Sequence, residues 1–327
     1  MGIRILQGGG LTTVQDLGRV GYQKSGFGTN GVMDVTSFRI ANFLLGNEEN
    51  TAALEFTLLG ASMEFTSAID FVLTGGDCSA TLDGEAIEPY TVVHANAGSA
   101  LKGGFVKSGA RVYFAVRGGF QIETVMGSAS TNLKCGLGGF MGRKLQPGDE
   151  IFFQAEKSGA NNAGEERIIH AKPGLKVQKY IEDWQTKIQE SKQGVTLRVI
   201  LGPQDDYFTE TGVQTFLSEE YSIGNESDRM GYRLEGAQIE SKAGVDIISD
   251  GIVPGSIQIP AKGTPIILLA DRQTTGGYAK IGTVISADLP LLAQCMPGTK
   301  IHFEELSVKK AQKILKKRSQ LWNRLTR

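Results

Sequence analysis

The sequence predicts a mainly β fold with a few helices, arranged as two β-rich halves. Glycine makes up 43 of the 327 residues and proline only 9, so the glycines serve tight turns and not a collagen repeat or a disordered tract. Short β-branched or alternating runs lie between these glycines, and strands do not alternate regularly with helices, which argues against a parallel α/β sheet. With 40% hydrophobic residues, the chain can bury a sizeable core.

Individual elements follow from local patterns. Four apolar or alternating runs that end at turn residues are predicted strands: 71–74, 111–116, 195–201 and 266–270. A helix is predicted between Asp34, a good N-cap, and Gly46, which stands where a C′ glycine belongs. A short helix is expected around 180–188.

The domain organisation follows from length and composition. A chain of 327 residues is at the size where single cores stop growing. Residues 154–194 are poor in periodic hydrophobics and rich in Glu, Lys, Gln, Asn and Gly, so they are predicted to connect two halves. The halves are then 1–153 and 195–305, and a basic helix covers 306–327.

This C-terminal helix combines an apolar stripe with many cations. The apolar positions are Val308, Ala311, Leu315 and Trp322. The prediction is a solvated basic face on a docked helix, and a membrane-surface or RNA role is the alternative. The cations are Lys309, Lys310, Lys313, Lys316, Lys317, Arg318, Arg324 and Arg327.

Charge, cysteine and histidine usage exclude several classes. A net charge of -1 lacks the excess of basic residues that is typical of a nucleic-acid-binding protein. Cys78, Cys135 and Cys295 show no metal-ligand spacing, and the three histidines form no zinc motif, so no metal site is expected. No apolar run approaches the roughly 20 residues that span a bilayer. We therefore expect a cytoplasmic protein without membrane or nucleic-acid partners.

Familiar nucleotide and hydrolase motifs are weak or absent. A G-x-G-x-x-G pattern occurs at Gly26, Gly28 and Gly31, but no buried strand precedes it as a dinucleotide site requires. An anion near the following helix N-terminus stays open, since unpaired amides would point at it. The sequence contains no P-loop and no G-x-S-x-G elbow.

Three polar clusters are candidate sites. The first is TTVQDLGRVGYQ, where Gln15, Asp16 and Arg19 crowd a turn that contains glycine. The alternative is a surface Asp–Arg pair of little energetic value.

The second cluster is SDRMGYRLEG, with Asp228, Arg229 and Arg233 around a glycine. Two guanidinium groups beside a carboxylate suit a bidentate grip on a carboxylate or phosphate.

The third cluster, LLADRQTTGGY, ends an apolar strand in polar residues and a glycine pair that permits close backbone approach. The alternative is a capped hairpin loop with an internal salt bridge. Its candidates are Asp271, Arg272, Gln273, Thr274, Thr275 and Tyr278.

At these segments the sequence resembles the family that contains the C subunit of bacterial 5-oxoprolinase, also called KipA or allophanate hydrolase subunit 2, which is related to the carboxyltransferase domain of urea carboxylase. The resemblance covers nearly the whole chain. Further matching segments are MDVTSFRIANFLLGN, ALEFTLLG, GSASTNLKCGLGGFMGR, GPQDDYF, GSIQIP and ISADLP.

The resemblance implies a cyclophilin-like β-barrel architecture and two partners from the same enzyme, a KipI-like B subunit together with an A subunit. It also implies ATP, with Mg²⁺, and the opening of 5-oxoproline to glutamate by phosphorylation of the lactam oxygen and hydrolysis. Such catalysis is mostly positioning and electrostatic stabilisation.

Residue types then suggest roles within that reaction. Arg229, Arg233 and Arg272 would hold phosphate or the substrate carboxylate, and Asp271 or Asp228 would take a proton or hold a metal-bound phosphate. Gln273, Thr274 and Thr275 would bind the lactam amide. We expect Asp271, Asp228 and Arg229 to be catalytic, and substrate to contact Gln15, Asp16, Arg19, Arg233, Arg272, Gln273, Thr274, Thr275 and Tyr278.

Two alternative functions stay open. A carboxyltransferase acting on urea or a similar amide would need a separate biotin carrier, because no Met here is followed by the Lys that carries biotin. The second alternative is a non-catalytic regulator that binds a KipI-like kinase inhibitor.

Overall fold

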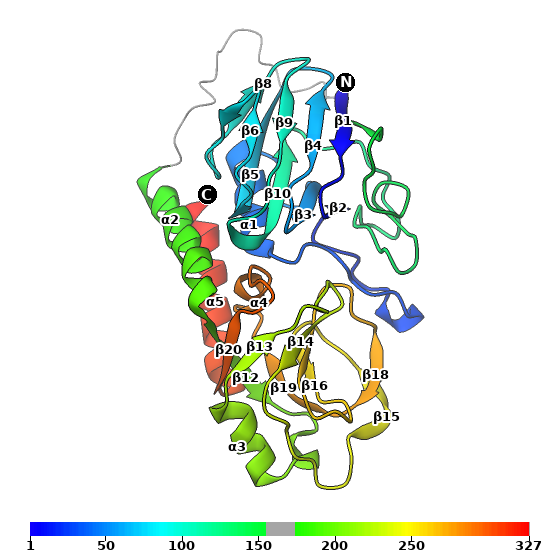
Figure 1. Cartoon of the computed structure of the whole chain (residues 1–327), viewed down its shortest axis with the longest axis vertical. Helices are drawn as coiled ribbons and strands as arrows, with labels where there is room; N and C mark the ends of the chain where they lie inside the picture. Colours follow the sequence, from blue (N-terminus) through cyan, green and yellow to red (C-terminus); the bar gives the residue numbers. More distant parts are fainter. Residues whose placement is uncertain (155–173, 327) are drawn as a thin grey trace. The chain divides into compact units, whose positions relative to one another are not determined.

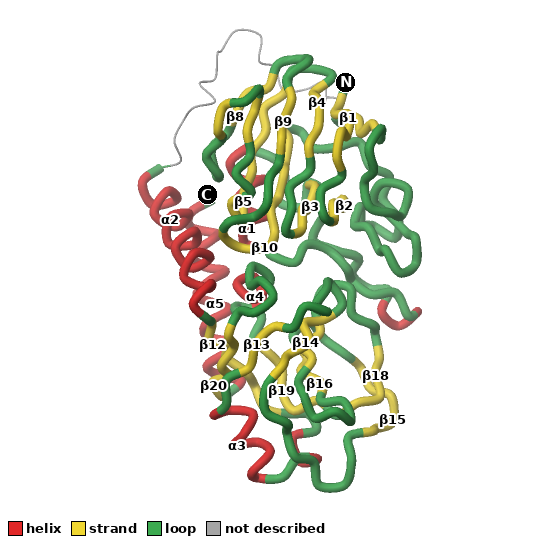
Figure 2. Tube along the Cα trace, in the orientation of Figure 1, coloured by secondary structure: helices red, strands yellow, loops and turns green. Residues whose placement is uncertain are grey.

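The computed structural model describes residues 1–154 and 174–326 (Figures 1 and 2). The chain forms two compact units. The first unit comprises Met1–Gly18 and Asp34–Lys187, and the second comprises Arg19–Met33 and Ile188–Arg327. The segment Arg19–Met33 therefore belongs to the second unit, although the chain on both sides of it belongs to the first. Residues 155–173 of the predicted connector lie outside the described residues.

The first unit contains two antiparallel sheets. One has the order β11-β1-β4-β9-β6-β7 and the other the order β2-β3-β10-β5-β8. The strands of the first sheet are β1 (Gly2–Gln7), β4 (Ser62–Phe65), β6 (Thr81–Leu82), β7 (Glu85–Ala86), β9 (Ala100–Lys102) and β11 (Glu150–Phe152). Those of the second are β2 (Leu11–Gln15), β3 (Ala53–Thr57), β5 (Ile69–Asp77), β8 (Val93–Ala95) and β10 (Ser108–Val116). Phenylalanines pack in the core, where Phe71 lies 5.2 Å from Phe65 and 5.4 Å from Phe114 between ring centroids.

Helix α1 (Val35–Leu45) packs on β5 and β10, and its predicted ends are confirmed. The Asp34 carboxylate accepts hydrogen bonds from the backbone N–H of Thr36 and Ser37 at 2.9 and 3.0 Å. Gly46 ends the helix with a left-handed φ of 69°. Because Asp34 fills the first turn, an anion does not fit at these amides.

Helix α2 (Leu175–Glu190) contains the short helix predicted around 180–188 and extends it at both ends. Its buried residues recur at helical spacing, at Val177, Ile181, Trp184 and Ile188.

The second unit is built on a closed barrel with the order β12-β19-β16-β17-β14-β13-β20, which confirms the predicted β-barrel architecture. Strands β12 and β20 pair in parallel, and the other barrel pairs are antiparallel. The barrel strands are β12 (Val195–Leu201), β13 (Tyr221–Ile223), β14 (Gly231–Glu235), β16 (Ser256–Gln258), β17 (Ile266–Leu268), β19 (Lys280–Val284) and β20 (Lys300–Glu305).

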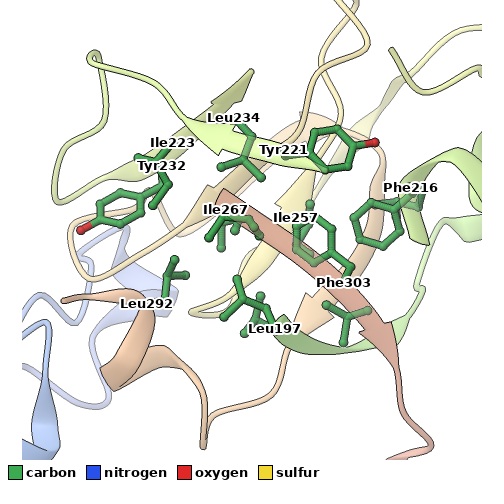
Figure 3. Packing of buried hydrophobic residues seen from close by; sticks show 14 of the residues in the cluster. Leu197, Phe216, Tyr221, Ile223, Tyr232, Leu234, Ile257, Ile267, Leu292 and Phe303 are labelled. Carbon is green, nitrogen blue, oxygen red and sulfur yellow. The ribbon is translucent and has the colours of Figure 1, made fainter. Parts of the chain in front are cut away.

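Side chains from every barrel strand fill the barrel, so it is a packed core. Figure 3 shows Leu197, Ile257 and Ile267 pointing toward one another, with the rings of Phe216 and Phe303 closing one side. These two rings stack at 4.4 Å. Met33, from the segment that the second unit takes from the N-terminal region, also belongs to this core.

Smaller elements complete the second unit. A two-stranded ribbon joins β15 (Asp246–Gly251) to β18 (Thr275–Tyr278), apart from the barrel sheet. The helices are α3 (Glu210–Ser218), α4 (Leu289–Leu292) and α5 (Val308–Leu325), and short 3-10 turns occupy Gln23–Ser25, Ser191–Gln193 and Asp205–Tyr207.

Helix α5 forms where it was predicted, but of the predicted apolar stripe it buries only Ala311, since Val308 and Leu315 are 52% and 45% exposed. Ala311 is buried and packs with Ile285 and Ala287, and Ile314 joins this cluster. The lysines of the helix are exposed, so its basic face is solvated.

Three predicted strands have different bounds. The strand predicted at 111–116 begins earlier, at Ser108. The strand predicted at 71–74 runs on through Gly75 and Gly76 to Asp77. The pairing of β5 with β10 shifts register next to Gly75, which has a φ of 89°, and glycine permits this irregularity inside a strand. The strand predicted at 266–270 ends at Leu268, because Leu269 and Ala270 lead into the turn before Asp271.

Candidate functional site

The second and third polar clusters meet through an ion pair between Arg229 and Asp271. Arg229 Nε lies 2.9 Å from Asp271 Oδ2, and Arg229 Nη2 lies 3.1 Å from Oδ1, so the pair is bidentate. The Arg229 side chain is 4% exposed and that of Asp271 is 11% exposed. The salt bridge is therefore not internal to one hairpin loop; it ties the start of β14 to the end of β17.

The segment with the G-x-G-x-x-G pattern supports this pair. Arg229 Nη2 also donates to the Gly31 carbonyl at 2.6 Å, and Asn30 Nδ2 donates to Asp271 Oδ1 at 2.8 Å. Asn30 adopts a left-handed φ of 52°, which asparagine tolerates better than most residues. Arg19, fully buried, donates from Nη1 to Asn30 Oδ1 at 3.2 Å. The segment that resembles a nucleotide loop thus packs around an ion pair.

Arg272 is buried without a carboxylate partner. Its side chain donates to the carbonyls of Ile252 and Leu269 and to Thr29 Oγ1, at 3.2 to 3.3 Å. None of the ion pairs formed within residues 1–154 and 174–326 includes Arg272. Burial therefore lowers the pKa of its guanidinium to about 10. A buried, uncompensated cation of this kind is suited to an anionic ligand.

The remaining residues of the second cluster have local roles or face solvent. Asp228 Oδ1 accepts from the backbone N–H of Met230 at 2.7 Å, so it caps its own turn. Arg233 is 57% exposed and lies 4.0 Å from Glu226. The two arginines of this cluster therefore differ, because Arg229 is buried and Arg233 is exposed.

The polar residues that follow Arg272 lie on or beside the ribbon. Thr275 and Tyr278 begin and end β18, and Gln273 and Thr274 precede it. No side-chain hydrogen bond joins these four to another residue in the part of the chain that the structure describes. Gln273, Thr275 and Tyr278 are exposed, so their donors and acceptors face solvent.

The first polar cluster is divided between the units. Gln15 and Asp16 belong to the first unit and Arg19 to the second. The Asp16 carboxylate accepts from Ser128 Oγ at 2.6 Å, Ser130 Oγ at 2.5 Å and the Ala129 N–H at 2.7 Å. Asp16 and Arg19 are 3% and 0% exposed, so the alternative of a surface pair is wrong.

Sequence reasoning missed two buried polar residues of the second unit, Gln258 on β16 and Lys280 on β19. Lys280 Nζ lies 2.8 Å from Asp250 Oδ2, and Nε2 of Gln258 has no hydrogen-bond partner among the described residues. The signal was present in GSIQIP, where one amide interrupts an apolar run. An alternating strand with a solvent face gives the same pattern.

Two of the three cysteines, Cys78 and Cys295, are buried. Burial raises the pKa of Cys78 to about 11 and that of Cys295 to about 12, so both thiols stay protonated near neutral pH. In the described ranges no cluster of His, Cys, Asp and Glu is placed to hold a metal ion. None of the described helices is long and apolar enough to cross a bilayer.

Comparison with known proteins places these residues in a recognised domain. A family model for the carboxyltransferase domain, subdomains A and B, matches residues 25–305. The C subunit of 5-oxoprolinase from Escherichia coli (strain K12) is 36% identical over 312 residues, which cover 95% of this chain and 93% of that protein.

Urea-processing proteins are also similar. Urea amidolyase of Saccharomyces cerevisiae is 32% identical over 328 residues, which cover 95% of this chain and 17% of that protein. The crystal structure of the K. lactis urea amidolyase matches 99% of this chain with a TM-score of 0.87 at 27% identity. This chain covers 20% of that structure.

Proposed function

Because the chain belongs to the carboxyltransferase domain family, we propose that it is the C subunit of an ATP-dependent 5-oxoprolinase. The observation that carries this proposal is the end-to-end similarity to the E. coli protein of that name, which covers 95% of this chain and 93% of the relative. Urea amidolyase, in contrast, contains the matching region as 17% of a longer chain. The matched region therefore makes up most of the 5-oxoprolinase subunit and only a small part of urea amidolyase.

The substrate of this reaction carries a carboxylate beside a cyclic amide. Arg272 suits that carboxylate, because the residue is 4% exposed and its guanidinium has no carboxylate partner among the described residues. An anion at Arg272 would compensate the buried positive charge of the guanidinium. The planar guanidinium group also matches a carboxylate in shape.

The contacts of Asp271 and Arg229 suit positioning residues. Arg229 and Asn30 already donate to the Asp271 carboxylate, so Asp271 is poorly placed to take a proton from substrate. Arg272 follows Asp271 directly. The ion pair therefore fixes the backbone from which Arg272 extends.

ATP, with Mg²⁺, would supply the phosphoryl group that activates the lactam oxygen. The N-terminus of α1 does not fit that group, because Asp34 already accepts from its amides. The proposal therefore includes two partners, a KipI-like B subunit together with an A subunit, which would bind ATP. In the net reaction one water molecule adds to the lactam carbonyl carbon, the ring C–N bond breaks, and the nitrogen leaves as the amine of glutamate. A second water molecule releases the phosphoryl group as inorganic phosphate, with ADP as the other product.

The test is reconstitution. The chain is co-expressed with the products of its neighbouring genes, and glutamate and ADP are measured from 5-oxoproline and ATP. We expect coupled formation of both, an increase in KM for 5-oxoproline of about tenfold or more in Arg272→Lys, and an unchanged KM in the exposed control Arg4→Lys. Absence of turnover with all subunits present would refute the proposal.

A urea carboxyltransferase is the second candidate, and the TM-score of 0.87 to the K. lactis urea amidolyase favours it. The reaction would need a separate biotin carrier, since no Met of this chain is followed by Lys. Bicarbonate-dependent turnover of urea that avidin abolishes would identify it. A stable complex with a KipI-like protein, without turnover of either substrate, would indicate the alternative function as a non-catalytic regulator.

A further inference from the structure

Two buried polar side chains project from the barrel wall side by side. Ile257 and Ile259 flank the last residue of β16, Ala279 and Ile281 flank the first residue of β19, and all four belong to the barrel core. The residue between each pair, Gln258 or Lys280, points to the opposite face, because successive side chains of a strand alternate. The two are Cα partners across β16 and β19, next to a register shift between Ile257 and Gln258. Their side chains lie on the same face, because both reach the ribbon β15–β18.

The ribbon β15–β18 covers these two side chains. A Cβ on Gly276 would lie 2.6 Å from Nε2 of Gln258 and 2.7 Å from Cδ1 of Ile252. Lys280 Nζ lies 2.8 Å from Asp250 Oδ2, and Asp250 is the Cα partner of Gly276 in the ribbon. The amide and the ammonium thus converge on one position of the ribbon, where a glycine leaves room.

Hydrogen-bond donors are in excess at this position. Gln258 Nε2 has no partner among the described residues although Gln258 is only 3% exposed. The Lys280 ammonium carries three donors, and Asp250 is the ion-pair partner that the described residues give it. An acceptor oxygen that meets both groups would satisfy them, and a buried donor left without an acceptor is unfavourable.

We propose that Gln258 and Lys280 bind the carbonyl oxygen of a carboxamide, specifically the lactam oxygen of the substrate, and this assignment rests on the proposed function. Asp250 already balances the charge of Lys280, so the position favours a neutral carbonyl over a carboxylate. Arg272 lacks such a partner and takes the carboxylate.

Both binding positions have a contact with Ile252. Arg272 Nε donates to the Ile252 carbonyl, and the Ile252 side chain lies beside Gly276. One small molecule with a carboxylate at one end and an amide carbonyl at the other matches this order. Because Gln258 Nε2 is buried, the ligand reaches it when the ribbon shifts at Gly276.

The experiment uses three probes on the full chain: 5-oxoproline, which has both groups, 2-pyrrolidinone, which has only the lactam, and acetate, which has only the carboxylate. Binding is measured by NMR titration of Gln258→Leu, Lys280→Met and Gly276→Ala, with exposed Gln238→Leu and Lys242→Met as matched controls. Thermal unfolding without ligand is recorded for each.

We expect 2-pyrrolidinone and 5-oxoproline to bind about tenfold or more weakly to Gln258→Leu and Lys280→Met, and the controls to bind like the unsubstituted chain. Acetate affinity should stay unchanged in Gln258→Leu and fall in Arg272→Lys. Gln258→Leu should also unfold at the same or a higher temperature, because it removes an unpaired donor. Gly276→Ala should weaken both lactams, since its methyl group meets Nε2.

Unchanged lactam binding in Gln258→Leu and Gly276→Ala, or no lactam binding by the unsubstituted chain, would overturn the assignment. Failure of the parent proposal is distinguishable. Loss of 2-pyrrolidinone binding in Gln258→Leu, together with no turnover by the reconstituted subunits, would reject the 5-oxoprolinase and retain the carbonyl position.

Discussion

Arg229 and Arg272 show how partners give two equally buried arginines different properties. Each follows an aspartate in sequence, at Asp228 and Asp271, and each is 4% exposed. The ion pair is crossed, because Arg229 takes the aspartate that precedes Arg272. The first arginine is neutralised, and the second keeps a charge without a carboxylate. Residue type predicted an arginine-rich site, but the choice of partner depends on chain segments 42 residues apart and needed the structure.

Replacing Asp271 by Asn tests this crossed pairing. The substitution leaves Arg229 buried without a counter-charge, so the free energy of unfolding should fall by about 3–5 kcal/mol. Urea denaturation measures the change. The control is Glu64→Gln, which removes a half-exposed partner of Arg4 and should cost at most about 1 kcal/mol. Equal effects of the two substitutions would contradict the role given to burial.

The pair Arg143–Asp149 predicts a pH-dependent contribution to stability. Two hydrogen bonds from Arg143 lower the pKa of Asp149 below its ordinary value of 3.8. A lowered folded pKa stabilises the protein above pH 3.8, and this contribution is lost as the pH falls through the folded pKa.

We therefore expect Arg143→Gln to lower the free energy of unfolding by roughly 1 kcal/mol at pH 7. The difference from the unsubstituted chain should shrink below about pH 4. Urea denaturation from about pH 2 to pH 7 measures this, with neighbouring exposed Lys144→Gln as the control. A difference that stays constant with pH would show that the lost contact is not the ion pair.

At the scale of elements, helix ends were predictable and the ribbon was not. The cap residues Asp34 and Gly46 act through local backbone geometry, which the sequence specifies directly. The ribbon strand β18 reads TGGY, and glycines in sequence indicate a loop. It is a strand because β15 pairs with it, a contact that no local pattern records. Gln258 and Lys280 were missed for the same reason, since the ribbon is what buries them.

The start of α1 gives a further prediction. Asp34 is fully buried and accepts from two backbone amides and from Ser37 Oγ. Asp34→Ala should lower the free energy of unfolding by about 2 kcal/mol, at the upper end for an N-cap. Ser307, the N-cap of α5, makes no side-chain cap bond, so Ser307→Ala is the matched control and should change it by at most about 0.5 kcal/mol. Comparable losses would contradict the capping account.

Docking of α5 is tested at Ala311, which is 8% exposed, against Leu315 on the same helix, which is 45% exposed. Ala311→Arg forces a long side chain into the cluster with Ile285 and should cost about 1–3 kcal/mol. Leu315→Arg adds the same charge at a solvated position and should have little effect. Thermal unfolding of both variants checks this. Equal melting temperatures would mean that the helix does not depend on this contact.

At the scale of the whole molecule, composition and glycine spacing predicted a β-rich protein, and the family resemblance implied a barrel. Neither could predict which segments build each unit. Arg19–Met33 belongs to the second unit, yet its residues form no strand and carry no long apolar run. Its place in the second unit depends on contacts such as the hydrogen bond from Arg229 to Gly31, two residues that are 198 positions apart in the sequence. Such distant contacts have no signature in a local pattern.

The position of Arg19–Met33 in the sequence affects how the second unit is synthesised and which fragments of it can be prepared. The ribosome releases Arg19–Met33 early, and the segment must wait for about 200 further residues before Arg229 emerges, on the order of 10–40 s at typical rates of synthesis. The matched family region begins at residue 25, so a fragment cut there would lack Arg19. A fragment that starts at residue 188 would lose Asn30, Gly31 and Met33 as well. The second unit thus contains a segment that is synthesised long before its barrel strands, and neither fragment would carry all the hydrogen bonds around Arg229 and Asp271.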